Sequence, residues 1–384
     1  MSKCILYLQY TNPAAYPPLQ HSSRILADRG WDVLFLGRET DDTQDLRFPP
    51  HERITVKRLP HISPGWKQKL HYLVFVLWAL GWALRWRPDW LYVSDPLACP
   101  AAWLLSFLPG VSTLYHEHDS PPPEKRRENE SAFMRLVGRS RRQLAQRADA
   151  CVLPNEQRAQ HFVQETEAAA TKVQYVWNCP ARDEAKPNSL RQDRDEIRVL
   201  YHGSLNTARL PFSVLDALAQ LPDRIRLEVV GYETIGSPGY LEKLKDYASR
   251  LGIFNRVDIR GAIPRSDLFD HARMCHIGLS FMPMQTDSVN MKYMTGASNK
   301  PFDYLASGLP LVVSDLPDWR EMFVTPGYAR ACDPRDPDGI TDVLRFYVEN
   351  PEERRRMGEK GRQRILNEWN YGEQFAPVRY TIEG

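Results

Sequence analysis

This chain lacks the residue patterns of metal and disulfide sites. Its six cysteines are scattered without a C-x-x-C pair, and no histidines cluster at zinc spacing. The sequence therefore predicts no structural metal and no disulfide framework, and a reducing cytoplasm suits it best. The N-terminus runs directly into a strand pattern, so we expect no signal peptide.

The chain also lacks a strong charge excess and a long hydrophobic run. Its net charge is only +2, which gives no indication of nucleic acid binding. The longest nearly apolar run, 70–84, is shorter than the roughly twenty residues that a membrane span needs. No internal repeat is visible. A length of 384 residues favours two domains of about 180 residues each.

Apolar runs with strand character alternate with helical patterns from end to end, which favours an α/β fold with parallel sheets. In the first half, the predicted strands are 5–10, 31–36, 89–93, 112–116 and 150–153. In the second half, they are 199–202, 227–230, 257–260, 277–281 and 311–313. Helices are predicted at 20–29, before Gly30, and at 351–368.

A change of composition divides the two series of strands. Residues 181–196 are rich in charged side chains and have no apolar periodicity, so we interpret them as a linker. The predicted domains are 1–180, with the tail 370–384, and 197–369. Two Rossmann-like halves would bind ligands at the carboxyl ends of their strands.

The run 298–315 carries the clearest chemical signal. Ser298, Asn299 and Lys300 form a polar turn before a short helix, and Asp303 lies one turn further along. Backbone N–H groups at a helix start, with a lysine beside them, suit a diphosphate. An acid one turn later suits the ribose hydroxyls of the same nucleotide. An ordinary helix–strand junction is the alternative interpretation.

A second phosphate-binding turn is predicted after the strand 199–202. Gly203 would let the backbone approach a phosphate, and Arg209 offers a bidentate guanidinium. Ser204 follows the glycine. Such a turn alone is weak evidence, but two such sites in this order strengthen each other.

These motifs resemble the donor site of GT-B glycosyltransferases, in particular the family-4-like retaining enzymes. That signature has an acid, seven residues, a second acid and then Ala-x-Gly-x-Pro. Asp303 takes the place of the second acid, and Gly296 takes that of the small residue after the first. Thr295 stands where the first acid is expected. Either Thr295 or a nearby acid such as Asp287 therefore has a different role from the family acid, or the enzyme follows a variant of the family's reaction scheme.

The resemblance covers most of 198–370 and implies further site residues. The family has cations at two positions of the glycine turn, and in this chain these positions hold Ser204 and Arg209. Because this leaves one cation fewer, Lys300 would carry more of the diphosphate charge. Gly261, in a Gly-x-x-Pro loop, would lie against the base. Glu321 matches the glutamate at the end of a family loop. It is either a residue of the binding site or a partner in a structural ion pair, and the sequence favours neither role.

In the first half, the useful run is 114–120, at the carboxyl end of a strand. The resemblance aligns His118 with a family histidine and Asp119 with its acid, and both would be catalytic. A neutral imidazole can exchange hydrogen bonds with a sugar or an acceptor hydroxyl. We interpret His116 as a packed residue. Zinc binding by this His-x-His pair has no evident third ligand.

The segment 53–87 raises the question of membrane contact. It has seven basic residues and no acid. Its apolar run 70–84 is either an interfacial helix with Trp78 and Trp82 as anchors or a helix buried against the first sheet. A second basic stretch, 135–147, includes Arg141 and is typical of a solvated helix face. Peripheral membrane contact through 67–87 would suit a lipid-linked acceptor.

The resemblance implies a GT-B fold, with two Rossmann-like domains facing a cleft and a C-terminal helix that crosses back to the first domain. We expect a metal-independent glycosyltransferase of polysaccharide biosynthesis, in the cytoplasm or at the inner face of the membrane. It would move a sugar from a nucleoside diphosphate sugar to a glycan or lipid-linked glycan, with retention and without cofactor. The alternatives are a GT-B epimerase or hydrolase and a non-catalytic scaffold. The base, sugar and acceptor are not readable from the sequence.

Overall fold

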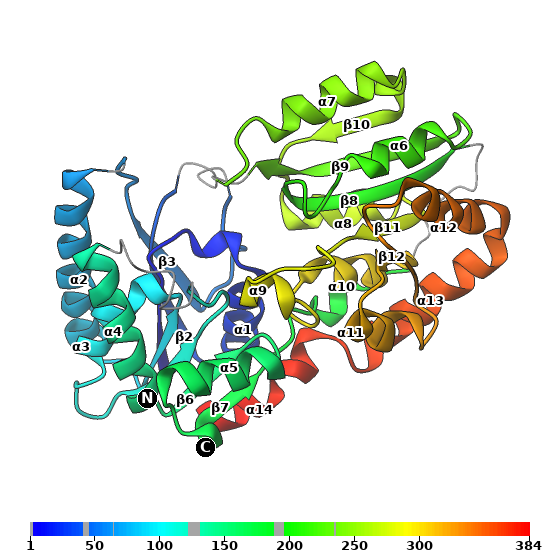
Figure 1. The fold of residues 1–384 in the computed structure, drawn as a ribbon. Coiled ribbons are helices and arrows are strands. Elements are labelled where there is room, and N and C mark those ends of the chain that lie inside the picture. The colour runs from blue at the N-terminus through cyan, green and yellow to red at the C-terminus, as the bar shows by residue number, and fades with distance from the viewer. Residues whose placement is uncertain (1–2, 41–45, 64, 122–130, 188–195, 234–235) are drawn as a thin grey trace. The chain divides into compact units, whose positions relative to one another are not determined.

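The computed structural model describes residues 3–40, 46–63, 65–121, 131–187, 196–233 and 236–384 (Figure 1). The chain forms two compact units. The first contains residues 1–178, 288–297 and 371–384, and the second contains 179–287 and 298–370. Each unit is built on a parallel sheet covered by helices on both faces, so the predicted α/β class is confirmed.

The first unit contains a seven-stranded sheet in the order β3-β2-β1-β4-β5-β6-β7. Its strands are β1 (Cys4–Leu8), β2 (Asp32–Arg38), β3 (Ile54–Leu59), β4 (Trp90–Ser94), β5 (Ser112–His116), β6 (Ala150–Leu153) and β7 (Val173–Tyr175). Its helices are α1 (Pro17–Asp28), α2 (Trp66–Trp86), α3 (Cys99–Leu105), α4 (Ala132–Arg147), α5 (Glu156–Thr166), α9 (Val289–Lys292) and α14 (Tyr371–Glu383), with short 3-10 turns between them.

The helices of the first unit form a layer on each face of the sheet. α2, α3, α4 and α5 cover one face, and α1 and α14 cover the other (Figure 1). The C-terminal helix α14 packs against α1 through Tyr371, Phe375 and Val378, which are fully buried. The return of the C-terminal helix to the first unit, which the resemblance implies, is therefore confirmed.

The second unit contains a six-stranded sheet in the order β10-β9-β8-β11-β12-β13. Its strands are β8 (Ile197–Leu205), β9 (Ile225–Glu233), β10 (Val257–Arg260), β11 (Ile277–Ser280), β12 (Leu311–Ser314) and β13 (Ala329–Cys332). Its helices are α6 (Ser213–Ala219), α7 (Tyr240–Arg250), α8 (Arg265–Ala272), α10 (Asn299–Ala306), α11 (Pro317–Trp319), a π-helix (Arg320–Val324), α12 (Pro337–Glu349) and α13 (Pro351–Asn367).

The start of α1 differs from the sequence prediction. The helix begins at Pro17 rather than at residue 20, because the first turn of a helix tolerates prolines. Gly30 follows its end with a φ of 91°, as expected of a glycine that terminates a helix.

The segment proposed as a linker is partly ordered. Residues 188–195 lie outside the described residues. Before them, Arg182–Glu184 form a 3-10 turn that belongs to the second unit, because Glu184 binds Arg265 of α8.

One side of helix α2 is buried against the first sheet, which agrees with one of the two interpretations that the sequence left open. Tyr72, Phe75, Ala79 and Ala83 are buried against the sheet, whereas the opposite side of the helix is exposed. Among the described residues, no helix has the length and apolar character needed to cross a membrane.

Candidate functional site

The predicted phosphate-binding residues meet at the carboxyl end of β8 in the second unit. Gly203 has a φ of 105°, a conformation that residues with side chains rarely adopt. A Cβ at this position would lie 2.9 Å from both Cε and Nζ of Lys300. The absence of a side chain at Gly203 is therefore what lets the ammonium group reach the backbone of the turn.

Arg209 lies on the same turn. The side chain of Asn206 accepts hydrogen bonds from the backbone N–H groups of Ala208 and Arg209, both at 3.1 Å. This local turn fixes the position of Arg209, whose side chain is largely buried and reaches Met282 Sδ at 2.6 Å.

The two cations act on each other. Burial, and next the charge of Arg209, lower the pKa of Lys300 to about 7, while Asp303 opposes the shift. The ammonium group also lies 5.5 Å from the centre of the Tyr201 ring. An added anion would relieve the repulsion between Lys300 and Arg209, so the pair is suited to binding phosphate.

Asp303 takes part in a buried ion-pair network. Arg265 Nη2 lies 2.8 Å from Asp303 Oδ1, and Arg265 Nη1 lies 3.3 Å from Oδ2. Arg265 also binds Glu184, with Nε 2.6 Å from Oε1. Burial raises the pKa of Asp303 to about 6, and Arg265 opposes the shift.

The sequence analysis missed Arg265, although a signal was present. Arg265 is the residue after the Gly-x-x-Pro loop and the first residue of α8. A ribose-binding role for Asp303 remains a proposal, and in this structure the carboxylate is oriented by Arg265.

The polar turn before α10 has no side-chain cap. Ser298 is the N-cap residue, and its side chain makes no capping hydrogen bond. Asn299 and Lys300 are the first two residues of the helix. This arrangement leaves the helix start suited to an external anion beside Lys300.

Gly261 and Glu321 are not part of this cluster. Gly261 is exposed in the loop after β10, and a Cβ there would have open space around it. Glu321 is exposed on the π-helix. Among the described residues, no hydrogen bond or ion pair links either one to Lys300 or Asp303.

Thr295 and Gly296 group with the first unit, not with the domain in which the sequence analysis placed them. The Thr295 carbonyl accepts a hydrogen bond from Asn155 at 2.7 Å, and that of Gly296 accepts one from Asn178 at 2.8 Å. A Cβ on Gly296 would lie 2.7 Å from the Trp177 ring. Contacts with residues far away in sequence hold this segment, which is why the sequence alone did not reveal its position.

In the first unit, His118 and Asp119 follow β5. Burial lowers the pKa of His118 to about 4, so its imidazole is neutral at pH 7. Its Nε2 atom is buried and has no hydrogen-bond partner among the described residues. The carboxylate of Asp119 is exposed and lies 3.4 Å from Arg158 Nη1. His116 is fully buried, and its Nδ1 atom lies 2.6 Å from the Tyr92 hydroxyl.

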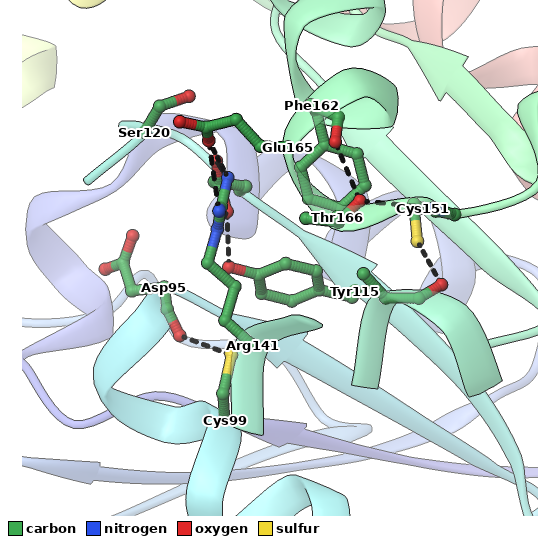
Figure 2. Close-up of polar contacts among 12 residues, drawn as sticks. Asp95, Cys99, Tyr115, Ser120, Arg141, Cys151, Phe162, Glu165 and Thr166 are labelled. Atoms are coloured by element: carbon green, nitrogen blue, oxygen red, sulfur yellow. Dashed lines mark hydrogen bonds and ion pairs between the residues drawn. The ribbon is translucent and has the colours of Figure 1, made fainter. Parts of the chain in front are cut away.

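The end of β5 is fixed by a buried ion pair. Arg141 donates to Glu117, with distances of 2.5 Å from Nε to Oε2 and 2.7 Å from Nη2 to Oε1. The Tyr115 hydroxyl donates to the same carboxylate at 2.6 Å, and Figure 2 shows Tyr115 and Arg141 together with Glu165. The prediction that Arg141 lies on a solvated helix face is wrong, because the glutamate draws this guanidinium into the core.

The described residues contain no group of three or more histidine, cysteine, aspartate or glutamate side chains that could hold a metal ion. The charged groups at the candidate site of the second unit are Lys300, Arg209 and the ion pair of Arg265 with Asp303. This set can bind a diphosphate and orient the hydroxyl groups beside it.

The sequence matches two family profiles. Residues 19–179 match a profile described as "Glycosyl transferase 4-like domain", and residues 213–378 match one described as "Glycosyl transferase-like". Together the two matches cover most of the chain.

Known proteins that are similar to the chain include two enzymes and a solved structure. It is 26% identical to the D-inositol 3-phosphate glycosyltransferase of Thermobifida fusca over 64% of this chain, which spans only 55% of that relative's length. It is 23% identical to the glycogen synthase of Mycobacterium tuberculosis over 93% of this chain and 89% of that protein. The structure of Anabaena HepE in complex with UDP and glucose has a TM-score of 0.71 and 17% identity, with 99% of each chain covered.

Proposed function

The chain belongs to the GT-B glycosyltransferases of the family-4-like type, and we propose that it moves a sugar from a nucleoside diphosphate sugar to a hydroxyl group of a glycan or lipid-linked glycan. The observation that carries this proposal is the contact between Lys300 and the Gly203 turn, with Arg209 beside it. Two cations at the carboxyl end of a parallel strand, next to a helix start, suit the diphosphate of such a donor.

The chemistry follows from the charge that develops during transfer. As the bond between the sugar and the diphosphate breaks, negative charge grows on the leaving phosphate. Lys300 and Arg209 would stabilise this charge, which is the work that a metal ion does in other enzymes. Asp303, oriented by Arg265, would accept hydrogen bonds from the ribose hydroxyls. We propose that transfer needs no metal and proceeds with retention, as the family resemblance implies.

A uridine diphosphate sugar is the first donor to test, because HepE, which resembles this chain in fold, was solved with UDP and glucose. The protein would be incubated with UDP-, GDP- and ADP-hexoses, each without acceptor, with soluble oligosaccharides and with lipid-linked oligosaccharides. Mass spectrometry would follow the products. An acceptor that gains one hexose supports the proposal.

The same assay separates the alternatives. An isomerised nucleotide sugar without acceptor would indicate an epimerase, and free sugar released equally fast with and without acceptor would indicate a hydrolase. Nucleotide binding without any product would indicate a scaffold. Each of these results would contradict the proposed transfer reaction.

The exposed side of α2 supports a place of action at a membrane. Six large apolar side chains, each about half exposed or more, form an apolar ridge on the helix: Trp66, Leu70, Leu73, Val74, Leu77 and Leu84. Their spacing of three, four and seven residues along most of this series places them along one side of the helix. Trp78 and Trp82, the anchors expected from the sequence, are instead partly buried against the core.

The basic residues at both ends of α2 favour an anionic partner for the apolar ridge. The exposed cations Lys67 and Lys69 lie at one end of α2, and Arg85 and Arg87 lie at the other. No acid occurs between Arg53 and Arg87. We propose that this surface docks on a bilayer that contains anionic lipid, with the ridge at the level of the headgroups. Such docking would bring the enzyme to a lipid-linked acceptor at the inner face of the membrane.

The docking surface can be tested with vesicles of phosphatidylcholine and phosphatidylglycerol. We expect the protein to float with these vesicles, and Leu73→Ser/Leu77→Ser to remain unbound. Phe254→Ser is the matched control, because Phe254 is a half-exposed apolar residue of the second unit. Added salt should weaken binding, since it screens the cations. Vesicle binding that the double variant retains, or no binding by the unmodified protein, would contradict the membrane proposal.

A further inference from the structure

The strand order of the first unit locates a second candidate site. The chain runs from β1 to β2 and β3 on one side of the sheet and from β4 onwards on the other. The switch point therefore lies between β1 and β4, and ligands of such sheets bind outside the carboxyl ends of the strands at this point. Gln9 directly follows β1, and Asp95 directly follows β4.

Asp95 has an unusual backbone conformation. Its φ is 70° and its ψ is 150°, a region that is otherwise almost restricted to glycine. Contacts on both sides hold it there. Its N–H donates to the His116 carbonyl at 3.3 Å, and its own carbonyl accepts from the Ala98 N–H. The same carbonyl accepts from the Cys99 thiol, as Figure 2 shows. An aspartate therefore occupies a position where glycine would be less strained, which indicates a functional role for its carboxylate.

The carboxylate is also held across the switch point. Gln9 Nε2 donates to Asp95 Oδ2 at 3.1 Å. Burial raises the pKa of Asp95 to about 6, while hydrogen bonds from Gln9 and Tyr16 oppose the shift and Glu117 adds to it. At pH 7 the group is therefore mostly a carboxylate, which accepts hydrogen bonds and donates none.

Several buried polar atoms in this region have no partner among the described residues. They include Oε1 of Gln9 and Nε2 of His118. The His118 ring lies 5.4 Å from the ring of Tyr16, whose hydroxyl is in turn close enough to Asp95 to influence its pKa. Buried polar atoms usually have partners, so these two indicate a polar ligand.

We propose that Asp95, Gln9 and His118 form a binding site for the hydroxyl groups of a polyol or sugar acceptor. Asp95 and Gln9 Oε1 accept hydrogen bonds from two hydroxyl groups, and the His118 imidazole exchanges one with the same ligand. This inference rests on the proposed function, because it gives the acceptor a binding site in the first unit. It adds Asp95 and Gln9, which the sequence analysis did not single out.

The test measures binding of simple polyols and sugars, without catalysis. Saturation-transfer NMR would follow myo-inositol, glucose and maltose with the unmodified protein, Asp95→Asn and Asp95→Gly. We expect at least one ligand to bind, and both variants to lose about ten- to a hundredfold in affinity, because a hydrogen bond to a charged group is lost. Asp95→Gly should also melt at a higher temperature, since glycine relieves the backbone strain.

Glu167→Gly is the matched control, because Glu167 is another residue of the first unit with a positive φ, 59°. It should gain stability and keep its affinity for the polyol. Unchanged polyol binding in both Asp95 variants, or no binding of any of the three ligands by the unmodified protein, would overturn the inference. Stabilisation by UDP, measured on the same samples, reports separately on the donor site of the second unit.

Discussion

Arg265 holds Asp303 with two hydrogen bonds, one to each carboxylate oxygen, at 2.8 and 3.3 Å. The acid of the donor signature is therefore part of the architecture of the second unit as well as a candidate ligand for ribose. Arg265 joins it to Glu184, which precedes the sheet of that unit. Any substitution of Asp303 thus changes folding stability and ligand binding together, and the two effects need separate measurements.

Replacing Asp303 by alanine should lower the free energy of unfolding by about 3–5 kcal/mol, because it removes one partner of a buried ion pair. Asp303→Asn keeps the shape and one acceptor oxygen, so it should cost less. Urea unfolding followed by circular dichroism would measure both. Asp258→Asn is the control, since Asp258 pairs with Arg260 at the surface and should change stability by under about 1 kcal/mol. A loss no larger for Asp303→Ala than for this control would contradict a structural role.

Gly203→Ala should abolish binding of a nucleoside diphosphate. The new methyl group would lie 2.9 Å from Lys300 Nζ and would push the ammonium away, in addition to straining the backbone. Gly252→Ala separates the two effects, because Gly252 has a φ of 72° and open space around it. We expect both variants to lose stability and only Gly203→Ala to lose UDP binding, as measured by calorimetry. Equal UDP affinity in the two variants would show that Lys300 does not act through this turn.

Binding of UDP should weaken as the pH rises. The pKa of Lys300 is lowered to about 7, so above pH 7 the free protein must take up a proton before it can bind the anion. The dissociation constant should rise by up to about tenfold per pH unit between pH 7 and 9. Lys300→Arg keeps its charge over this range, so its profile should be flatter. Parallel profiles for the two proteins would show that another group titrates.

Glu117→Gln should be among the most destabilising changes in the first unit. It leaves the buried Arg141 without its main counter-charge, which should cost about 3–5 kcal/mol of unfolding free energy. Glu165→Gln is the matched comparison, because Glu165 binds the same guanidinium but is partly exposed. Its cost should be about 1 kcal/mol. Denaturant unfolding would rank the two, and the reverse order would contradict this account of the pair.

The sequence predicted the central strands and the edge strand β10. It missed β3, β7 and β13, which are the other edge strands of the two sheets. Central parallel strands are apolar on both faces and read as continuous runs, whereas edge strands such as β3 carry polar and half-exposed residues. The pattern that predicts a strand is therefore weakest at the edges of a sheet.

The candidate site was predictable where the signal is local. Gly203, Lys300 and Arg209 follow from turn and helix-start chemistry within a few residues, and the structure brings them together. Arg265 and Asp95 were missed for a different reason. The importance of Arg265 depends on partners far away in sequence, and that of Asp95 depends on a backbone angle that no residue pattern reveals.

The most direct test of the account is calorimetric and thermal-shift measurement of UDP, GDP and ADP binding without magnesium, with the unmodified protein and Lys300→Met. Lys300→Met removes a partly buried cation, so it should fold at least as well. We predict that one nucleotide stabilises the unmodified protein by about 2.7 kcal/mol at a hundred times its dissociation constant. Lys300→Met should lose at least about tenfold in affinity. Folded protein that binds none of the three, or equal affinity in Lys300→Met, would contradict the proposed donor site.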